Sequence, residues 1–174
     1  PHCSAQDIAV VHNGIIENHA QLRSQLQAAG YVFVSQSDSE VIAHLLHFYA
    51  RTEVDFVHAI RRSCDAMEGS MALAILNRKT PGQLWGFRRR SPLLLAEGQG
   101  CCFLASDIHA IEFPVEGVIY LEDEDLVQIC DGHASIFDHQ LQPLKRSMQE
   151  APSFAVMDQS TPAQDSDDTS LGPY

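Results

Sequence analysis

Two residues near the start of the chain, Asn13 and Gly14, have the types and spacing that could stabilise a negative charge. His12, Asn13 and Gly14 directly follow an apolar, mostly β-branched run that begins at Ile8. Asn-Gly pairs favour turns because both residues tolerate positive φ, and leucines at helical spacing follow. The pattern predicts a buried strand that turns sharply into a helix. Such an elbow exposes backbone N–H groups and an amide side chain, donors that can hold a developing negative charge.

A second candidate is Asp38, an acid at the start of the next expected helix. Ser37 followed by Glu40 has the spacing of a capping box, which predicts a helix from there through about Ala50. The helix dipole alone favours an acid in the first turn. By its position alone, Asp38 can be explained as an acid that stabilises the helix start.

Composition excludes several classes of partner. The 174 residues carry a formal net charge of −12 and no basic patch, which argues against nucleic acid and anionic membrane as partners. No apolar run approaches the ~20 residues of a membrane span. Five cysteines without a C-x-x-C pair suit a reducing, cytoplasmic environment. His44 and His47 stand at helical spacing but lack a third ligand at a useful distance, so we expect no metal site.

The hydrophobic pattern changes from helical to strand periodicity near residue 70, which indicates an α+β fold with a mainly antiparallel meander. A short helical turn is expected at 107–112. Residues 149–174 are rich in Ser, Asp and Pro and predict a disordered tail, which leaves one domain over 1–148. The expected helices cover 18–29, 37–50 and 54–67, and the expected strands cover 7–12, 31–34, 71–77, 84–87, 93–96, 101–106, 118–122, 126–130 and 134–138.

Two segments at a fixed separation, HNGIIEN and SDSEVIAH, carry a resemblance to a known family. Together with EGSMALAIL, RRRSPLLLA, FLASDIHAI, IYLEDEDLVQI and ASIFD, they closely resemble the glutamine-hydrolysing domain of the glutamine–fructose-6-phosphate aminotransferases. These enzymes are class II amidotransferases with the N-terminal nucleophile hydrolase fold. The resemblance covers residues 1 to about 148. It implies a four-layer αββα sandwich that is incomplete at its N-terminus in this sequence.

The resemblance implies roles for three residues. Asn13, through its side-chain amide, and Gly14, through its backbone N–H, match the oxyanion hole of the family. Asp38 matches the acid that holds the α-ammonium group of glutamine. The family's nucleophile, a thiol at the mature N-terminus, has no counterpart here, and Cys3 is not a substitute because it has no α-amino group of its own. We therefore expect the stretch alone not to hydrolyse glutamine.

The family's reaction moves the amide nitrogen of glutamine to fructose 6-phosphate, giving glucosamine 6-phosphate and glutamate in amino sugar biosynthesis. The resemblance implies glutamine as a partner, no cofactor, and a cytoplasmic location. Fructose 6-phosphate would be met only through isomerase domains that this sequence lacks, and most contacts of the family dimer would be absent as well. The alternative is a non-catalytic remnant or a module that binds glutamine or a partner protein.

Two positions depart from the family pattern. Arg90 stands where the family usually has Gly before Ser-Pro-Leu, and Glu124 stands where many members have Gly. A Gly that needs positive φ cannot be replaced freely, so the two turns are expected to be disturbed. The absence of the first strands would also expose an edge and part of an inner face. We therefore expect marginal stability for this stretch made alone.

Overall fold

The computed structural model describes residues 1–151, and all its strand pairs between named strands are antiparallel. The α+β class is therefore confirmed. The disordered tail expected at 149–174 is wrong at its start, because residues 149–150 form a strand paired with residues 117–118; from 152 onward the tail lies outside the described residues. One sheet contains, in spatial order, β1 (His2–Ser4), β2 (Ile8–Ile16), β3 (Gly69–Asn77), β4 (Gln83–Arg89), β8 (Leu126–Cys130), β9 (His133–Phe137) and β10 (Pro143–Leu144). The other contains β11 (Gln149–Glu150), β7 (Gly117–Tyr120), β5 (Leu94–Gly98) and β6 (Cys101–Ala105).

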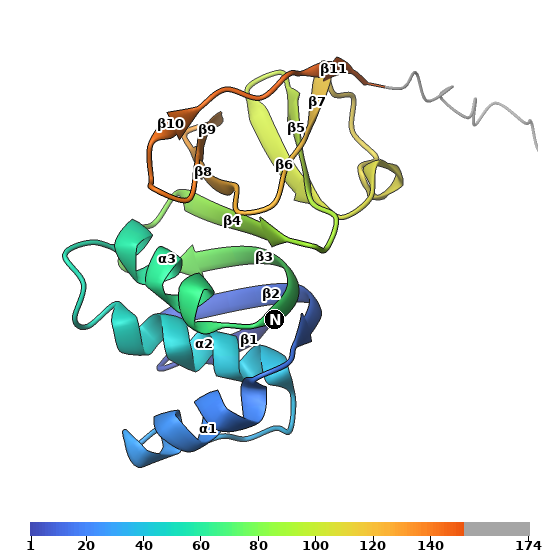
Figure 1. The fold of residues 1–174 in the computed structure, drawn as a ribbon. Helices are drawn as coiled ribbons and strands as arrows, with labels where there is room; N and C mark the ends of the chain where they lie inside the picture. Colours follow the sequence, from blue (N-terminus) through green and yellow to red (C-terminus); the bar gives the residue numbers. More distant parts are fainter. Residues whose placement is uncertain (152–174) are drawn as a thin grey trace, which may run out of the picture.

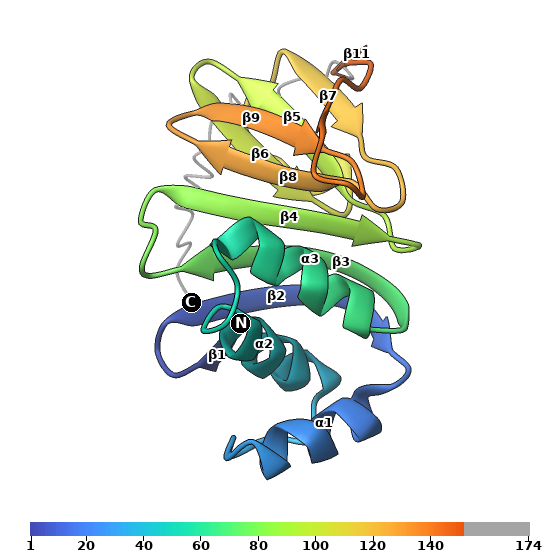
Figure 2. The ribbon, with the colours of Figure 1, turned by 60° about the vertical axis from the view of Figure 1, so that its left-hand side comes forward.

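Three helices lie along the β1–β4 half of the larger sheet (Figures 1 and 2). They are α1 (His19–Ala28), α2 (Asp38–Tyr49) and α3 (Phe56–Ala66). Their buried side chains form one core with the facing side of the sheet, which includes Val10, Ile16 and Leu73. No helix in the described part of the chain is long and apolar enough to cross a membrane.

The smaller sheet packs on the opposite face of the larger one, over β8 and β9. Val127, Ile129 and Ile136 of the larger sheet share a second core with Leu95 and Ile119 of the smaller. The outer face of the smaller sheet carries a short 3₁₀ helix, η1 (Ile108–Ala110), and no α-helix from the described residues 1–151. The fourth layer of the expected αββα sandwich, its second layer of helices, thus stays a prediction.

Two of the expected local structures are wrong. Residues 31–34 form no strand, although the segment contains β-branched residues. Val32 and Val34 are 78% and 92% exposed, because no neighbouring strand pairs with them.

The Ser37–Glu40 capping box is only half formed: Ser37 Oγ accepts from the N–H of Ser39, at 3.2 Å. The Glu40 carboxylate does not bond back to Ser37 but accepts from the N–H groups of residues 34 and 35, both at 2.7 Å.

The two positions that depart from the family pattern keep a glycine-like backbone. Arg90 has φ +61° and Glu124 has φ +74°. The expected disturbance is therefore not seen; non-glycine residues adopt the left-handed conformation at a cost of about 1–2 kcal/mol each. Arg90 is stabilised by a hydrogen bond from its N–H to the Asp123 carboxylate, at 2.8 Å.

Glu124 has a larger compensation, because its carboxylate joins two guanidinium groups. Arg61 donates to Oε2 of Glu124 at 2.9 Å, and Arg89 donates to both carboxylate oxygens. Burial opposes ionisation of this carboxyl, but the hydrogen bonds from Arg89 and Arg61 outweigh it and lower the pKa of Glu124. The side chains of Arg61 and Arg89 are only 8% and 16% exposed, so they depend on this counter-charge.

We expect opposite effects from restoring glycine at these two positions. Arg90→Gly removes left-handed strain and an exposed side chain, so it should raise the free energy of unfolding by about 0.5–1 kcal/mol. Glu124→Gly also removes strain but takes the shared carboxylate away from the largely buried Arg61 and Arg89, so it should lower the free energy of unfolding by about 2 kcal/mol or more. Urea unfolding measures both. Arg90→Ala is the control, since it keeps the strain, and a stabilised Glu124→Gly variant would contradict the argument.

Candidate functional site

Asn13 and Gly14 lie inside β2, not in a turn at its end. The strand continues to Ile16, with Asn13 paired to Ala72 and Gly14 to Met71 of β3. The expected strand-to-helix elbow at Asn-Gly is therefore wrong, because nine paired residues outweigh the local turn tendency. Glycine is needed at position 14 for other reasons. Its φ is +142°, and a Cβ there would lie 2.1 Å from the Ser70 carbonyl oxygen.

The register of this pairing decides where the Gly14 N–H points. Asp7 accepts from the N–H of Arg78 at one end, and the N–H of Glu17 donates to Glu68 at the other. Because hydrogen-bonded and non-hydrogen-bonded pairs alternate along an antiparallel ladder, Gly14 falls in a non-hydrogen-bonded pair. Its N–H therefore points away from β3, toward the edge where the pairing with β1 ends at Val10.

Asp38 lies at this same edge of β2. The N–H of Ile16 points the same way as that of Gly14 and donates to Asp38 Oδ2 at 2.9 Å. This bond joins the first residue of α2 to the end of β2 across 22 residues of sequence. The structure thus brings Asp38 to the edge of β2 on which the Gly14 N–H is directed.

Asn13 presents its amide on the face of the sheet opposite the helices. Val10 and Ile16 are buried in the helical core, so Val11, Asn13 and Ile15 alternate to the other side, where all three are exposed. Nδ2 of Asn13 donates to Oγ of Ser106, at 3.2 Å. Ser106 was missed by sequence reasoning, since 93 residues separate it from Asn13 and no local pattern connects them.

His12 ties β2 to the start of α2 from the helical side. Its Nδ1 lies 3.0 Å from Oγ of Ser39, which lies 3.5 Å from the other oxygen of Asp38. Burial lowers the pKa of His12, and this outweighs the opposite influence of Asp38 and of the Ser70 backbone. His12 is therefore neutral near pH 7. Its imidazole ring then offers no positive charge to the nearby Asp38 carboxylate.

The remaining sequence candidates have structural roles. His44 is buried with Nδ1 2.8 Å from Oγ of Ser4, and His47 lies 2.8 Å from the hydroxyl of Tyr31. Cys3 pairs with Ala9, four residues and ~13 Å along β2 from Asn13. Among the described residues, one group has side chains close enough to share an ion: Asp65, Glu124 and His139. Its central carboxylate is already held by the Arg61 and Arg89 guanidiniums, so we assign no metal to it.

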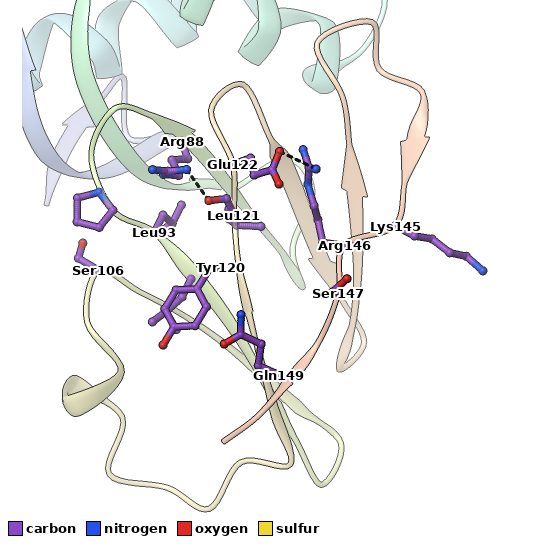
Figure 3. A pocket seen from close by; sticks show the side chains of 12 residues that line it. Arg88, Leu93, Ser106, Tyr120, Leu121, Glu122, Lys145, Arg146, Ser147 and Gln149 are labelled. Atoms are coloured by element: carbon purple, nitrogen blue, oxygen red, sulfur yellow. Dashed lines mark hydrogen bonds and ion pairs between the residues drawn. The ribbon is translucent and has the colours of Figure 1, made fainter. Parts of the chain in front are cut away.

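A cavity of about 500 Å³ lies beside the site, with Ser106 in its wall (Figure 3). Its two arginines have internal partners: Arg88 donates to the Leu121 carbonyl at 2.6 Å, and Arg146 pairs with Glu122 at 2.8 Å. Lys145 points away from the cavity in Figure 3. The guanidinium charges of the wall are therefore already partnered within the protein.

The fold and the site define a class. A family model described as a glutamine amidotransferase domain matches residues 1–113, a range that includes Asn13, Asp38 and Ser106, and the chain belongs to this family. Two solved structures share the fold. One is the glutamine phosphoribosylpyrophosphate amidotransferase of B. subtilis, with TM-score 0.65, 21% identity, and coverage of 82% of this chain and 31% of that one. The other, an allosteric regulatory enzyme of purine biosynthesis, has TM-score 0.66 and the same identity, with coverage of 81% and 30%.

Within the class II amidotransferases, the chain is homologous to the N-terminal region of the glutamine–fructose-6-phosphate aminotransferases. It is 42% identical to the Pseudomonas putida protein over 146 residues, which are 84% of this chain and 24% of that one. It is 43% identical to the Xylella fastidiosa protein over 148 residues, 85% and 24% of the two chains. The chain thus spans about a quarter of the length of these relatives.

The close approach at Gly14 gives a sharp test of the site's backbone. Gly14→Ala places a side chain on a backbone with positive φ and also brings its Cβ into a clash with the Ser70 carbonyl oxygen. Together these should lower the free energy of unfolding by about 3 kcal/mol. Gly30→Ala is a matched control, because Gly30 has φ +91° but nothing within 4 Å of its Cβ position; we expect a loss of about 1–2 kcal/mol. Urea unfolding compares the two. Equal losses would show that the strand does not approach Ser70 this closely.

The lowered pKa of His12 predicts a dependence of stability on pH. The unfolded chain takes up its proton near pH 6.5, whereas the folded chain does so only at lower pH. The contribution of neutral, buried His12 to the free energy of unfolding is therefore fully present above pH 6.5. It falls as the pH drops toward the folded-state pKa, by at most ~1.4 kcal/mol per pH unit. His12→Gln should flatten that part of the profile in urea titrations. An unchanged slope, or a ring that titrates above 6.5 by NMR, would contradict this.

Proposed function

We propose that this chain is the glutamine-hydrolysing part of an amidotransferase that moves the amide nitrogen of glutamine to fructose 6-phosphate, giving glucosamine 6-phosphate and glutamate. One observation carries the proposal. The Gly14 N–H and the Asp38 carboxylate lie along a single open edge of β2, and Asn13, the residue before Gly14 in this strand, offers its amide on the sheet face opposite the helices. The similarity to the glutamine–fructose-6-phosphate aminotransferases supports the choice of acceptor.

In this proposal Asn13 and Gly14 form the oxyanion hole. A thiolate attacks the amide carbon of the glutamine side chain, and the carbonyl electrons move to oxygen. The Asn13 amide and the Gly14 N–H donate to that oxyanion as neutral dipoles fixed before the reaction. The nitrogen of the intermediate takes up the proton that the thiol lost, collapse then expels ammonia and leaves a thioester, and water releases glutamate and the thiol.

The nucleophile in this scheme is not among residues 1–174, so a segment upstream of Pro1 would have to supply it. Cys3 does not replace it, because it lies in β1, remote from Asn13 along the sheet. We therefore expect no glutamine hydrolysis from residues 1–174 alone.

Asp38 is proposed to bind the α-ammonium group of glutamine. A charge-assisted contact of this kind separates glutamine from amides that lack the ammonium. The neutral state of His12 supports this role, since a protonated ring near Asp38 would compete with the substrate for the carboxylate. The bond from Ile16 holds one carboxylate oxygen and fixes the orientation of the group.

The fold proposal is the complete four-layer sandwich of the N-terminal nucleophile hydrolases. Val11 and Ile15 of β2 and Leu76 of β3 are 57%, 65% and 51% exposed on the face opposite the helices. We infer that a further layer of the complete sandwich covers this face. The left-handed Arg90 and Glu124 keep their turns, so these two departures do not by themselves favour a non-catalytic remnant.

The proposal is tested with the natural, full-length protein by measuring glutamate release from glutamine. Asn13→Ala should lower kcat about 10²–10³-fold, because it removes one oxyanion donor. Asp38→Asn should raise KM for glutamine and should reduce the preference for glutamine over glutaramate, the same amide without its α-amino group. Asp131→Asn is the control, because Asp131 lies in the exposed turn between β8 and β9. It should change neither kcat nor KM. No hydrolysis by the full-length protein, or full activity in Asn13→Ala, would refute the proposal.

A further inference from the structure

We propose that Ser106 is a positioning residue that orients the Asn13 amide in the oxyanion hole. The inference rests on the proposed function and adds to it a residue from a distant part of the chain. Its basis is the hydrogen bond from Asn13 Nδ2 to Ser106 Oγ, 3.2 Å long, which joins β2 of the larger sheet to the end of β6 in the smaller.

The chemistry of the amide explains why such a partner matters. The amide nitrogen of asparagine carries two hydrogens, so one can bind Ser106 while the other stays available for an oxyanion. The terminal torsion of asparagine is broad and leaves the amide plane poorly fixed. A turned amide would present its oxygen, an acceptor, to the developing negative charge. In the structure Nδ2 is the atom bonded to Ser106 Oγ, so this contact fixes the amide plane with one N–H engaged and the other available.

The local structure holds Ser106 firmly enough for this purpose. The preceding residue, Ala105, pairs with Leu94 at the end of β6. The following residue, Asp107, caps η1 by accepting from the N–H of His109 at 2.9 Å. Ser106 therefore stands between a paired strand and a capped helical turn, which limits the movement of its Cα.

The exposure of the contact separates positioning from stability. Asn13 and Ser106 are both exposed, and water can replace a lost hydrogen bond between exposed groups at little cost to folding. Removing the hydroxyl should therefore leave the protein folded but the amide misoriented. A purely structural role would instead change the unfolding midpoint and leave catalysis unaffected.

The contact can be observed without any catalytic activity. In asparagine-selective ¹⁵N spectra of the full-length protein, the side-chain amide pair of Asn13 is the one lost in Asn13→Ala, and the pairs of Asn18 and Asn77, assigned in the same way, serve as references. Ser106→Ala should shift the Asn13 pair and leave the other two in place, and Ser106→Thr should keep the original position. Ser135→Ala, at an exposed residue of β9, is the matched control and should shift none. An unmoved Asn13 pair in Ser106→Ala would overturn the proposal.

The kinetic test uses the full-length protein. Ser106→Ala should lower kcat for glutamine hydrolysis about tenfold, the equivalent of one hydrogen bond, with KM within about twofold and the unfolding midpoint unchanged. Ser106→Thr should restore kcat. An unchanged kcat, or a lowered midpoint with parallel loss of kcat in the threonine variant, would overturn the proposal. If the wild type releases no glutamate, the proposed function fails, whereas the amide spectrum still decides whether Ser106 holds Asn13.

Discussion

The candidate site depends on the unbroken pairing of β2 with β3. Nine consecutive pairs determine which residues of β2 donate their N–H groups to β3 and which direct them to the open edge of the sheet. A shift of one residue would turn the Gly14 N–H inward and bury the Asn13 side chain among the helices. The register is secured by Ile8, Val10 and Ile16, which are at most 2% exposed in the helical core. The same alternation that builds the core therefore places the two donors.

The helix start at Asp38 depends on β2 as well. An acid at the first position of a helix is favoured by the dipole, but here it also accepts from the Ile16 N–H at the strand end. Glu40 satisfies the N–H groups of residues 34 and 35 in the preceding loop. The two acids of this turn thus fix the loop and the strand to one helix. The acid proposed to bind substrate is oriented by the fold itself, through Ile16.

Strong periodicity made most elements predictable, and competition between local and distant partners explains the errors. The helices at 38–49 and 56–66 and the strands from 69 to 137 follow from apolar spacing and confirm the expected pattern within a few residues, whereas the short strands β1, β10 and β11 were not expected. The Asn-Gly pair was misread because turn propensity is local, whereas the ladder with β3 is not. The segment 31–34 has strand composition but no neighbour, which no local pattern reveals. Ser106 could not be found for the same reason: the contact joins two sheets across 93 residues.

The uncovered face of β2 connects stability to the proposed chemistry. Asn13 lies between Val11 and Ile15, which expose 57% and 65% of their surface on that face. A covering segment would bury this apolar surface and stabilise the fold by about 25 cal/mol for each Å² removed from water. It would also remove water from the amide and from its bond to Ser106, and electrostatic interactions strengthen as the local dielectric falls. Burial of Val11 and Ile15 and activation of the oxyanion donors would then be consequences of the same contact.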